Sequence, residues 1–105
     1  MKSKLSLSVI FILFLNVVDV NAQCVTKDVN MPVCISEAYL DKAISYISVS
    51  DMDALSTLFD YGYCTFIAPN IDVYLESSTW TGKVEIRAKG STSTNWTVSE
   101  AIKCK

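Results

Sequence analysis

Hydrophobic and polar residues alternate with two different periods along the chain, a helical period in the first half and a strand-like period in the second. From Ser36 onward, apolar residues recur at helical spacing in two successive stripes. Ser36 is a suitable N-cap for the first helix, and Ser50 with Asp53 resembles a capping box for the second. Gly62 suits the position just beyond the second helix. The pattern predicts a helical pair over residues 36–62.

After Gly62 the period of the hydrophobic pattern falls to two. Aromatic, β-branched and aliphatic residues alternate with polar ones and are separated by polar turns. Ser99 suits the start of a last helical turn that leads to Cys104, whereas residues 23–32 show no clear period. The alternation predicts four strands, over residues 63–68, 71–76, 83–89 and 96–98.

The first 22 residues have a different pattern. Lysines precede an unbroken apolar run over residues 9–15, and the segment ends on the small residue Ala22. This arrangement is typical of a secretory signal peptide. The run is too short to cross a bilayer, which takes about 20 apolar residues. We therefore expect a signal peptide at 1–22, a mature chain from Gln23 without a membrane span, and a periplasmic or extracellular location.

The four cysteines all follow this segment. An even number in a short exported chain predicts two disulfides. A zinc site is disfavoured, because the chain has no histidine and no pair of cysteines two residues apart. We favour Cys34–Cys64 with Cys24–Cys104, which would tie the helical pair to the following strand and fasten both ends of the mature chain. The alternative pairs Cys24 with Cys34 and Cys64 with Cys104.

The segment from residue 64 to 102 resembles bacterial SH3-type domains. The matching positions are a Val-x-Ile-Arg strand, a Gly-led polar turn and a closing Trp-Thr-Val, namely Val84, Ile86, Arg87, Gly90, Trp96 and Val98. The resemblance implies a small antiparallel barrel with tight turns. We therefore expect one exported α+β domain over 23–105, in which an N-terminal two-helix hairpin packs on an SH3-like sheet or barrel over 63–105.

Charge and composition exclude several functions. Without residues 1–22, seven basic and ten acidic residues remain, a formal charge of −3. This charge argues against binding to nucleic acid or to an anionic membrane surface. Catalysis is disfavoured because there is no histidine and no nucleophile or phosphate-loop motif. We read Asp51 and Asp53 as helix-start residues, and Asp72 and Glu76 as a solvated strand face, so we expect no enzyme and no cofactor.

Aromatic residues give the better indication of function. Trp80 falls in a predicted loop, while Tyr74 and Arg87 fall on the polar sides of their strands. Tyr and Trp are common in recognition surfaces, so we expect a protein-binding surface formed by Trp80, Tyr74 and Arg87. We read Trp96 and Phe66 as core residues. Asn95 begins an Asn-x-Thr sequon, which is accidental if the source is bacterial.

The first hypothesis is therefore a small exported protein-binding module without catalytic activity. A periplasmic inhibitor, an immunity-type protein and an accessory subunit of an envelope machine all fit this description. A secreted toxin or effector is the alternative, and a hydrolase that uses surface carboxylates is a third class. The neighbouring genes would help to distinguish these roles. A toxin gene beside this one favours an immunity protein, and a cluster of secretion genes favours an accessory subunit.

Overall fold

The computed structural model describes residues 23–104; the predicted signal peptide and Lys105 lie outside the described residues. Within this range the chain forms seven β-strands, two α-helices and one 3-10 helix. In chain order these are β1 (Gln23–Thr26), β2 (Pro32–Cys34), α2 (Glu37–Ser48), α3 (Met52–Asp60), β3 (Cys64–Phe66), β4 (Asp72–Ser78), β5 (Lys83–Ala88), β6 (Asn95–Val98), η1 (Ser99–Ala101) and β7 (Ile102–Cys104).

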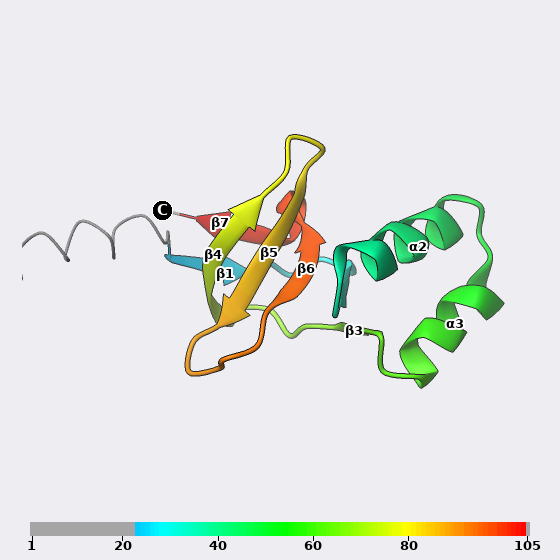
Figure 1. Ribbon diagram of the computed structural model, residues 1–105, viewed down its shortest axis with the longest axis horizontal. Coiled ribbons are helices and arrows are strands. Elements are labelled where there is room, and N and C mark those ends of the chain that lie inside the picture. Colours follow the sequence, from blue (N-terminus) through cyan, green and yellow to red (C-terminus); the bar gives the residue numbers. More distant parts are fainter. Residues whose placement is uncertain (1–22, 105) are drawn as a thin grey trace, which may run out of the picture.

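The strands form one antiparallel sheet in the order β3-β2-β6-β5-β4-β1-β7. This sheet has two parts, joined where β2 and β6 share a single paired position, Cys34 opposite Trp96. We call β1 and β4–β7 the sheet region, and residues 32–66, which comprise β2, α2, α3 and β3, the helical region. Figure 1 shows the helical region to one side of the sheet region. The helical region is thus an insertion between β1 and β4.

The expected N-terminal two-helix hairpin is wrong, because β1 and β2 precede the helices. β1 lies between β4 and β7, with Cys24 and Thr26 buried. The Thr26 hydroxyl donates to the Ala68 carbonyl (2.7 Å) and accepts from the Ile71 amide (2.9 Å). Strands of three or four residues are too short to show alternation, so residues 23–32 looked irregular. For the same reason the sequence predicts a helical turn up to Cys104, where the structure has the short strand β7.

The start of α3 also differs from the sequence prediction. Ser36 caps α2 as expected, because its hydroxyl accepts from the Tyr39 amide (3.2 Å). For α3, however, the cap is Asp51, whose carboxylate accepts from the Ala54 amide (3.2 Å). Ser50 has a φ of 58°, in the left-handed region, and it forms the tight link between the helices instead. The capping-box pattern therefore located the second helix but placed its cap one residue early.

Both predicted disulfides are confirmed, and each ties an edge strand of the sheet to its neighbour. Cys24 in β1 lies opposite Cys104 in β7, and Cys34 in β2 lies opposite Cys64 in β3, with 4.0 Å between the Cα atoms in each pair. β7 and β3 are the two ends of the sheet, and each has three residues. Strands this short form few ladder hydrogen bonds, so a covalent link is an effective way to hold them.

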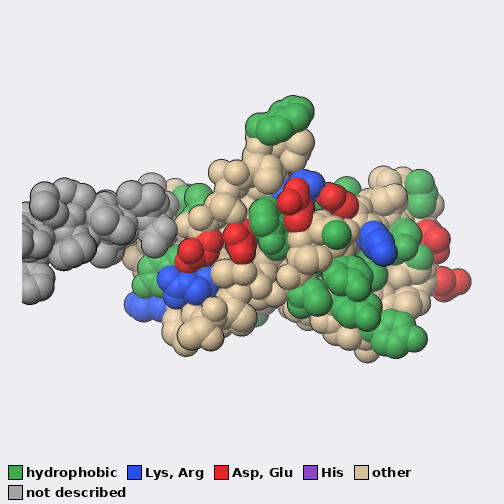
Figure 2. Space-filling model, in the orientation of Figure 1, with side chains coloured by type: hydrophobic (Ala, Val, Ile, Leu, Met, Phe, Trp, Pro, Cys, Tyr) green, Lys and Arg blue, Asp and Glu red, His purple; other side chains and the backbone are tan. Residues whose placement is uncertain are grey.

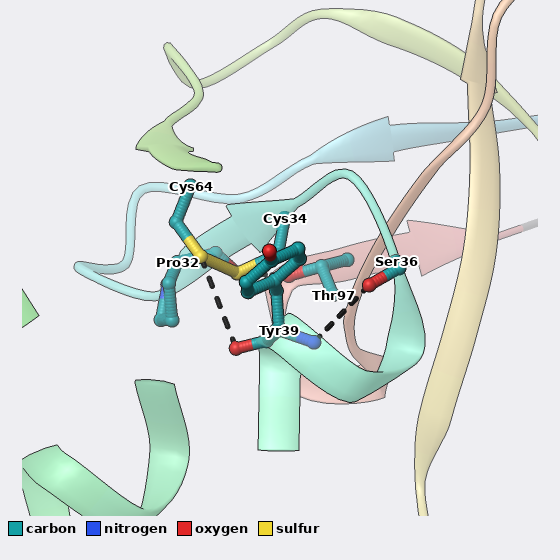
Figure 3. Close-up of a disulfide and its surroundings, with 6 residues drawn as sticks. All are labelled: Pro32, Cys34, Ser36, Tyr39, Cys64 and Thr97. Atoms are coloured by element: carbon teal, nitrogen blue, oxygen red, sulfur yellow. Dashed lines mark hydrogen bonds between the residues drawn. A yellow bond between two sulfur atoms is a disulfide. The ribbon is translucent and has the colours of Figure 1, made fainter. Parts of the chain in front are cut away.

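The molecule has two separate hydrophobic cores, one in the sheet region and one in the helical region. The core of the sheet region is formed by Cys24, Val73, Val84, Ile86 and Ile102. The core of the helical region is formed by Cys34, Leu40, Ala43, Leu58 and Cys64, with aromatic residues around it. Figure 3 shows the Cys34–Cys64 disulfide beside the Tyr39 ring at the start of α2. The Cys64 sulfur lies 3.9 Å from the Tyr39 carbonyl oxygen, a packing contact because a disulfide sulfur carries no proton.

An ion-pair cluster fastens α2 to the sheet region. The Lys83 ammonium on β5 lies 2.7 Å from the Asp41 carboxylate and 2.8 Å from that of Glu37, both on α2. The hydrogen bonds to Asp41 and Glu37 raise the pKa of Lys83 above its ordinary value. The positive charge of Lys83 on β5 is therefore paired with two carboxylates of α2, which links the helix to the sheet. No helix within residues 23–104 is long and apolar enough to cross a membrane.

Candidate functional site

The structure brings two of the three predicted binding residues together. Tyr74 on β4 lies directly opposite Arg87 on β5, and the guanidinium stacks on the tyrosine ring, 4.8 Å from its centroid. Arg87 also donates to the Glu76 carboxylate (2.9 Å) and to the Ser91 carbonyl (3.3 Å). An arginine placed over an aromatic face is attracted by the ring. Tyr74 and Arg87 thus form an ordered, half-buried pair near one end of the β4–β5 hairpin.

A bulge in β4 helps to form this pair. The register of β4 against β5 shifts between Leu75 and Ser77, which leaves Glu76 as the extra residue. A bulge of this kind bends the strand and redirects a side chain. Here the carboxylate of the extra residue pairs with Arg87, although the residue remains exposed. Glu76, which the sequence placed with Asp72 on a solvated face, is therefore half of an ion pair.

Trp80 lies at the opposite end of the same hairpin, and its exposed fraction is 96%. The turn around it is tightly bonded: the Lys83 amide donates to the Thr79 hydroxyl (3.1 Å) and the Thr79 amide to the Lys83 carbonyl (2.8 Å). Gly82, with a φ of 90°, supplies the left-handed conformation that this turn needs. Figure 2 shows hydrophobic side-chain atoms at the tip of the hairpin, which projects from the sheet. The indole is therefore presented on a well-ordered turn.

The three residues do not form one continuous patch. Tyr74 and Trp80 are six positions apart along an extended strand and its turn, which corresponds to roughly 20 Å. A partner would need to contact the hairpin along its length to touch both. The sequence therefore located residues of one hairpin, with the stacked pair near its base and the exposed indole at its tip.

A second surface was missed by the sequence analysis. Phe66 was expected in the core, but its exposed fraction is 51%. It lines an apolar groove of about 250 Å³ between α3 and β3, together with Met52, Leu55, Ser56 and Phe59. Phe66 is exposed because β3 is an edge strand, and an edge position cannot be read from a single aromatic residue in a short apolar run.

The remaining features have structural roles or lie at the limit of the described residues. The Tyr39 and Tyr63 rings stack with their centroids 4.2 Å apart, and the hydrogen bond to Tyr63 raises the pKa of Tyr39. A second cavity, of about 290 Å³, lies at the Cys24–Cys104 disulfide, at the two ends of the described range. Within residues 23–104, no group of three or more Asp, Glu or Cys residues is placed to hold a metal ion.

No family model matches this chain, and neither a curated protein nor a solved structure matches it. Its function must therefore be inferred from its own residues. Exposed aromatic side chains of the described surface lie at the hairpin tip (Trp80), at the end of α3 (Tyr61) and in the groove between α3 and β3 (Phe66). Surfaces of this kind suit recognition, because aromatic side chains bury a large area at low entropic cost.

Proposed function

We propose that the mature chain is an exported protein-binding module that works without catalysis, in the periplasm or outside the cell. The observation that carries this proposal is the almost complete exposure of Trp80, at 96%, on the tip of a well-bonded hairpin. A tryptophan held on an ordered turn offers a large rigid contact area, and tryptophan is enriched among the residues that anchor protein interfaces. A periplasmic inhibitor, an immunity-type protein or an envelope accessory subunit would use such a contact.

The anchoring of the hairpin supports this function. β4 and β5 are paired on both outer sides, by β1 and by β6, and β1 is tied covalently to β7. A recognition residue on a rigid support loses little conformational entropy on binding, which improves affinity. The two disulfides indicate a non-cytoplasmic protein, since such bonds persist in oxidising compartments.

The resemblance to bacterial SH3-type domains stays a prediction. β4, β5 and β6 follow one another as antiparallel neighbours, as the resemblance implies, whereas β3, the first strand of the matching segment, pairs with β2 and not with β4. The helical region is not implied by that resemblance. Small barrels also carry many unrelated functions, so the resemblance adds nothing about the partner.

Affinity capture with matched variants tests the proposal. Wild-type mature protein, Trp80→Ala and Tyr61→Ala would each be used as bait for envelope extract and culture medium. Tyr61 is the control, because it is also an exposed aromatic residue, at 71%, but lies at the end of α3. Arg87→Gln would report whether the base of the hairpin contributes.

We expect a protein that wild type and Tyr61→Ala retain and Trp80→Ala loses. With the purified partner, Trp80→Ala should weaken binding by about thirtyfold, the effect of losing roughly 2 kcal/mol at an aromatic anchor. Equal capture by wild type and Trp80→Ala would contradict a role for the hairpin tip.

A further inference from the structure

The groove between α3 and β3, which we call the α3–β3 groove, exposes apolar side chains next to a strand edge. The Phe59 and Phe66 rings lie 4.7 Å apart in it, and Met52 at its rim has an exposed fraction of 53%. Figure 2 shows hydrophobic side chains gathered on the surface of the helical region as a whole. The groove is lined by a helix on one side and by an edge strand on the other, which is the geometry that an added strand needs.

The backbone of β3 has one side open. β3 pairs with β2 and ends the sheet, so no described strand lies on its other side. The Ile35 amide donates to the Tyr63 carbonyl, and backbone groups alternate along a strand, so Thr65 also faces β2. The amides and carbonyls of Cys64 and Phe66 therefore point away from β2. Cys64 is buried, with an exposed fraction of 3%, so within β3 a new strand can reach the amide and carbonyl of Phe66. The Phe66 carbonyl also accepts a long hydrogen bond from the Thr65 hydroxyl (3.4 Å).

The charge around the groove is of one sign. Asp51, Asp53 and Asp60 lie on α3 or at its N-cap, and all three are exposed. There is no lysine or arginine between residues 43 and 82, and Lys42, on α2, lies over the Tyr39 ring, 5.5 Å from its centroid. Lys83, the next basic residue, already pairs with Glu37 and Asp41. A partner segment with basic residues beside apolar ones would match both the charge and the apolar surface of the groove.

We propose that the α3–β3 groove binds an extended, lysine- or arginine-flanked apolar segment of a partner protein, which adds as a strand to β3. Backbone hydrogen bonds to Phe66 supply part of the affinity, and alternate side chains of the segment enter the groove. The basic flanks face the aspartates of α3. This surface is distinct from the hairpin tip, and the proposal stands or falls independently of the role of Trp80.

Three synthetic peptides test this proposal with the full mature protein. The first alternates Val and Thr and has lysines at both ends, the second replaces those lysines with glutamates, and the third is the lysine peptide with alternate backbone nitrogens methylated. N-methylation blocks strand addition but keeps the side chains. Binding would be measured by amide chemical-shift changes and by titration at low and high salt.

We expect the lysine peptide to bind and to shift the amide signals of residues 52–66, while the glutamate and N-methylated peptides bind at least tenfold more weakly. Phe66→Thr should weaken the lysine peptide about tenfold, as for an aromatic anchor. Asp53→Asn should weaken it less, and its effect should vanish at high salt. Val49→Thr is the control, because Val49 is exposed (69%) but does not line the groove.

Equal binding of the lysine and glutamate peptides would overturn the charge argument, and equal binding of the N-methylated peptide would overturn strand addition. The proposal also fails if no peptide binds, or if Phe66→Thr, shown to be folded by its amide spectrum, binds like wild type. Should Phe66→Thr not fold, Asp53→Asn decides the outcome, since its side chain is exposed and makes no contact with the core.

Discussion

The sheet region and the helical region are each held by one disulfide between neighbouring strands, but their hydrophobic cores differ in composition. In each region one disulfide joins directly opposed residues of an edge strand and its neighbour. The core of the sheet region is aliphatic, apart from its disulfide, with Leu75 packed against it. The core of the helical region is surrounded by half-buried aromatic residues, including Tyr39, Phe59, Tyr63 and Trp96.

This difference explains where the exposed apolar surface lies. A small aliphatic core inside the sheet can be closed by its own strands, and the large apolar side chain that this region exposes, Trp80, lies in a turn away from the core. Two short helices cannot cover their aromatic residues completely, so Phe66 and Met52 remain half exposed. In the sheet region the exposed aromatic side chain is Trp80 at the hairpin tip, whereas in the helical region several partly covered side chains border the groove. Each region therefore carries one candidate recognition surface.

The disulfides should show the largest effects on stability. The Cys24–Cys104 bond spans 80 residues and the Cys34–Cys64 bond spans 30. Loop-closure entropy then predicts a loss of about 4.5 kcal/mol for Cys24→Ala/Cys104→Ala and about 3.6 kcal/mol for Cys34→Ala/Cys64→Ala. Urea unfolding of the two variants measures both values.

The two variants should also differ in what unfolds. Cys34 and Cys64 lie in β2 and β3, the strands that precede and follow the two helices. Without their bond, the amides of the helical region should therefore lose protection from hydrogen exchange before those of β4 and β5 do. A larger loss of stability from the shorter bridge, or uniform loss of protection in both variants, would contradict the division into two regions.

Matched core truncations should give the next largest effects. Leu40 in the helical core has an exposed fraction of 0%, and Ile86 in the sheet core has one of 2%. Either change to Ala removes a buried branched side chain and should cost about 2–5 kcal/mol in unfolding free energy. Leu40→Ala should raise amide exchange mainly within residues 32–66, whereas Ile86→Ala should raise it throughout. Identical exchange profiles would mean that both cores form one cooperative unit.

The sequence predicted the longer elements and the disulfides because each has a local signal. Helical stripes and an N-cap defined α2, alternation defined β4 and β5, and the even number of cysteines together with their positions favoured the observed pairing. The short strands β1, β2 and β7 carry no such signal, since their partners lie far away along the chain. β1, for instance, is a strand because β4 and β7 flank it, with Thr26 satisfied by the distant Ala68.

The same reasoning applies to the candidate binding residues. The exposure of Trp80 was expected, because it falls between two alternating segments in a polar loop. The exposure of Phe66 was not expected, because an aromatic residue in a short apolar run looks the same at an edge as at the centre of a sheet. The strand order that makes β3 an edge depends on contacts distant in sequence, which a single sequence does not display.

Lys83 should show a smaller effect that depends on pH. Its pKa is raised above the ordinary 10.5, first by the hydrogen bond to Asp41 and then by that to Glu37. The folded chain holds this proton more tightly than the unfolded chain, so the contribution is complete below pH 10.5 and is lost as the pH rises through the raised pKa. We expect Lys83→Met to lower the melting temperature at neutral pH and to flatten its decline in alkali.

The pKa of Tyr39 is raised as well, from an ordinary 10.0, and would add to the alkaline decline in the same direction. Thermal melts of wild type, Lys83→Met and Tyr39→Phe across the alkaline range separate the two groups. Because the ion pairs join α2 to β5, high salt should reduce the difference between wild type and Lys83→Met. An unchanged difference in high salt would indicate lost packing of the lysine chain rather than lost charge.

Trp80 should have the smallest effect on stability, although it is the largest exposed side chain. With 96% of its surface in water, the indole gains little from folding, so Trp80→Ala should change the unfolding free energy by no more than about 0.5 kcal/mol. Trp96, which is partly buried against the helical core, is the contrasting tryptophan, and Trp96→Ala should cost up to about 3 kcal/mol, the lower end of the range for a buried aromatic residue. Urea unfolding followed by circular dichroism measures both without depending on tryptophan fluorescence. A stability loss at Trp80 comparable to that at Trp96 would mean that the hairpin tip has a structural role, and the apolar surface used for recognition would then lie in the helical region alone.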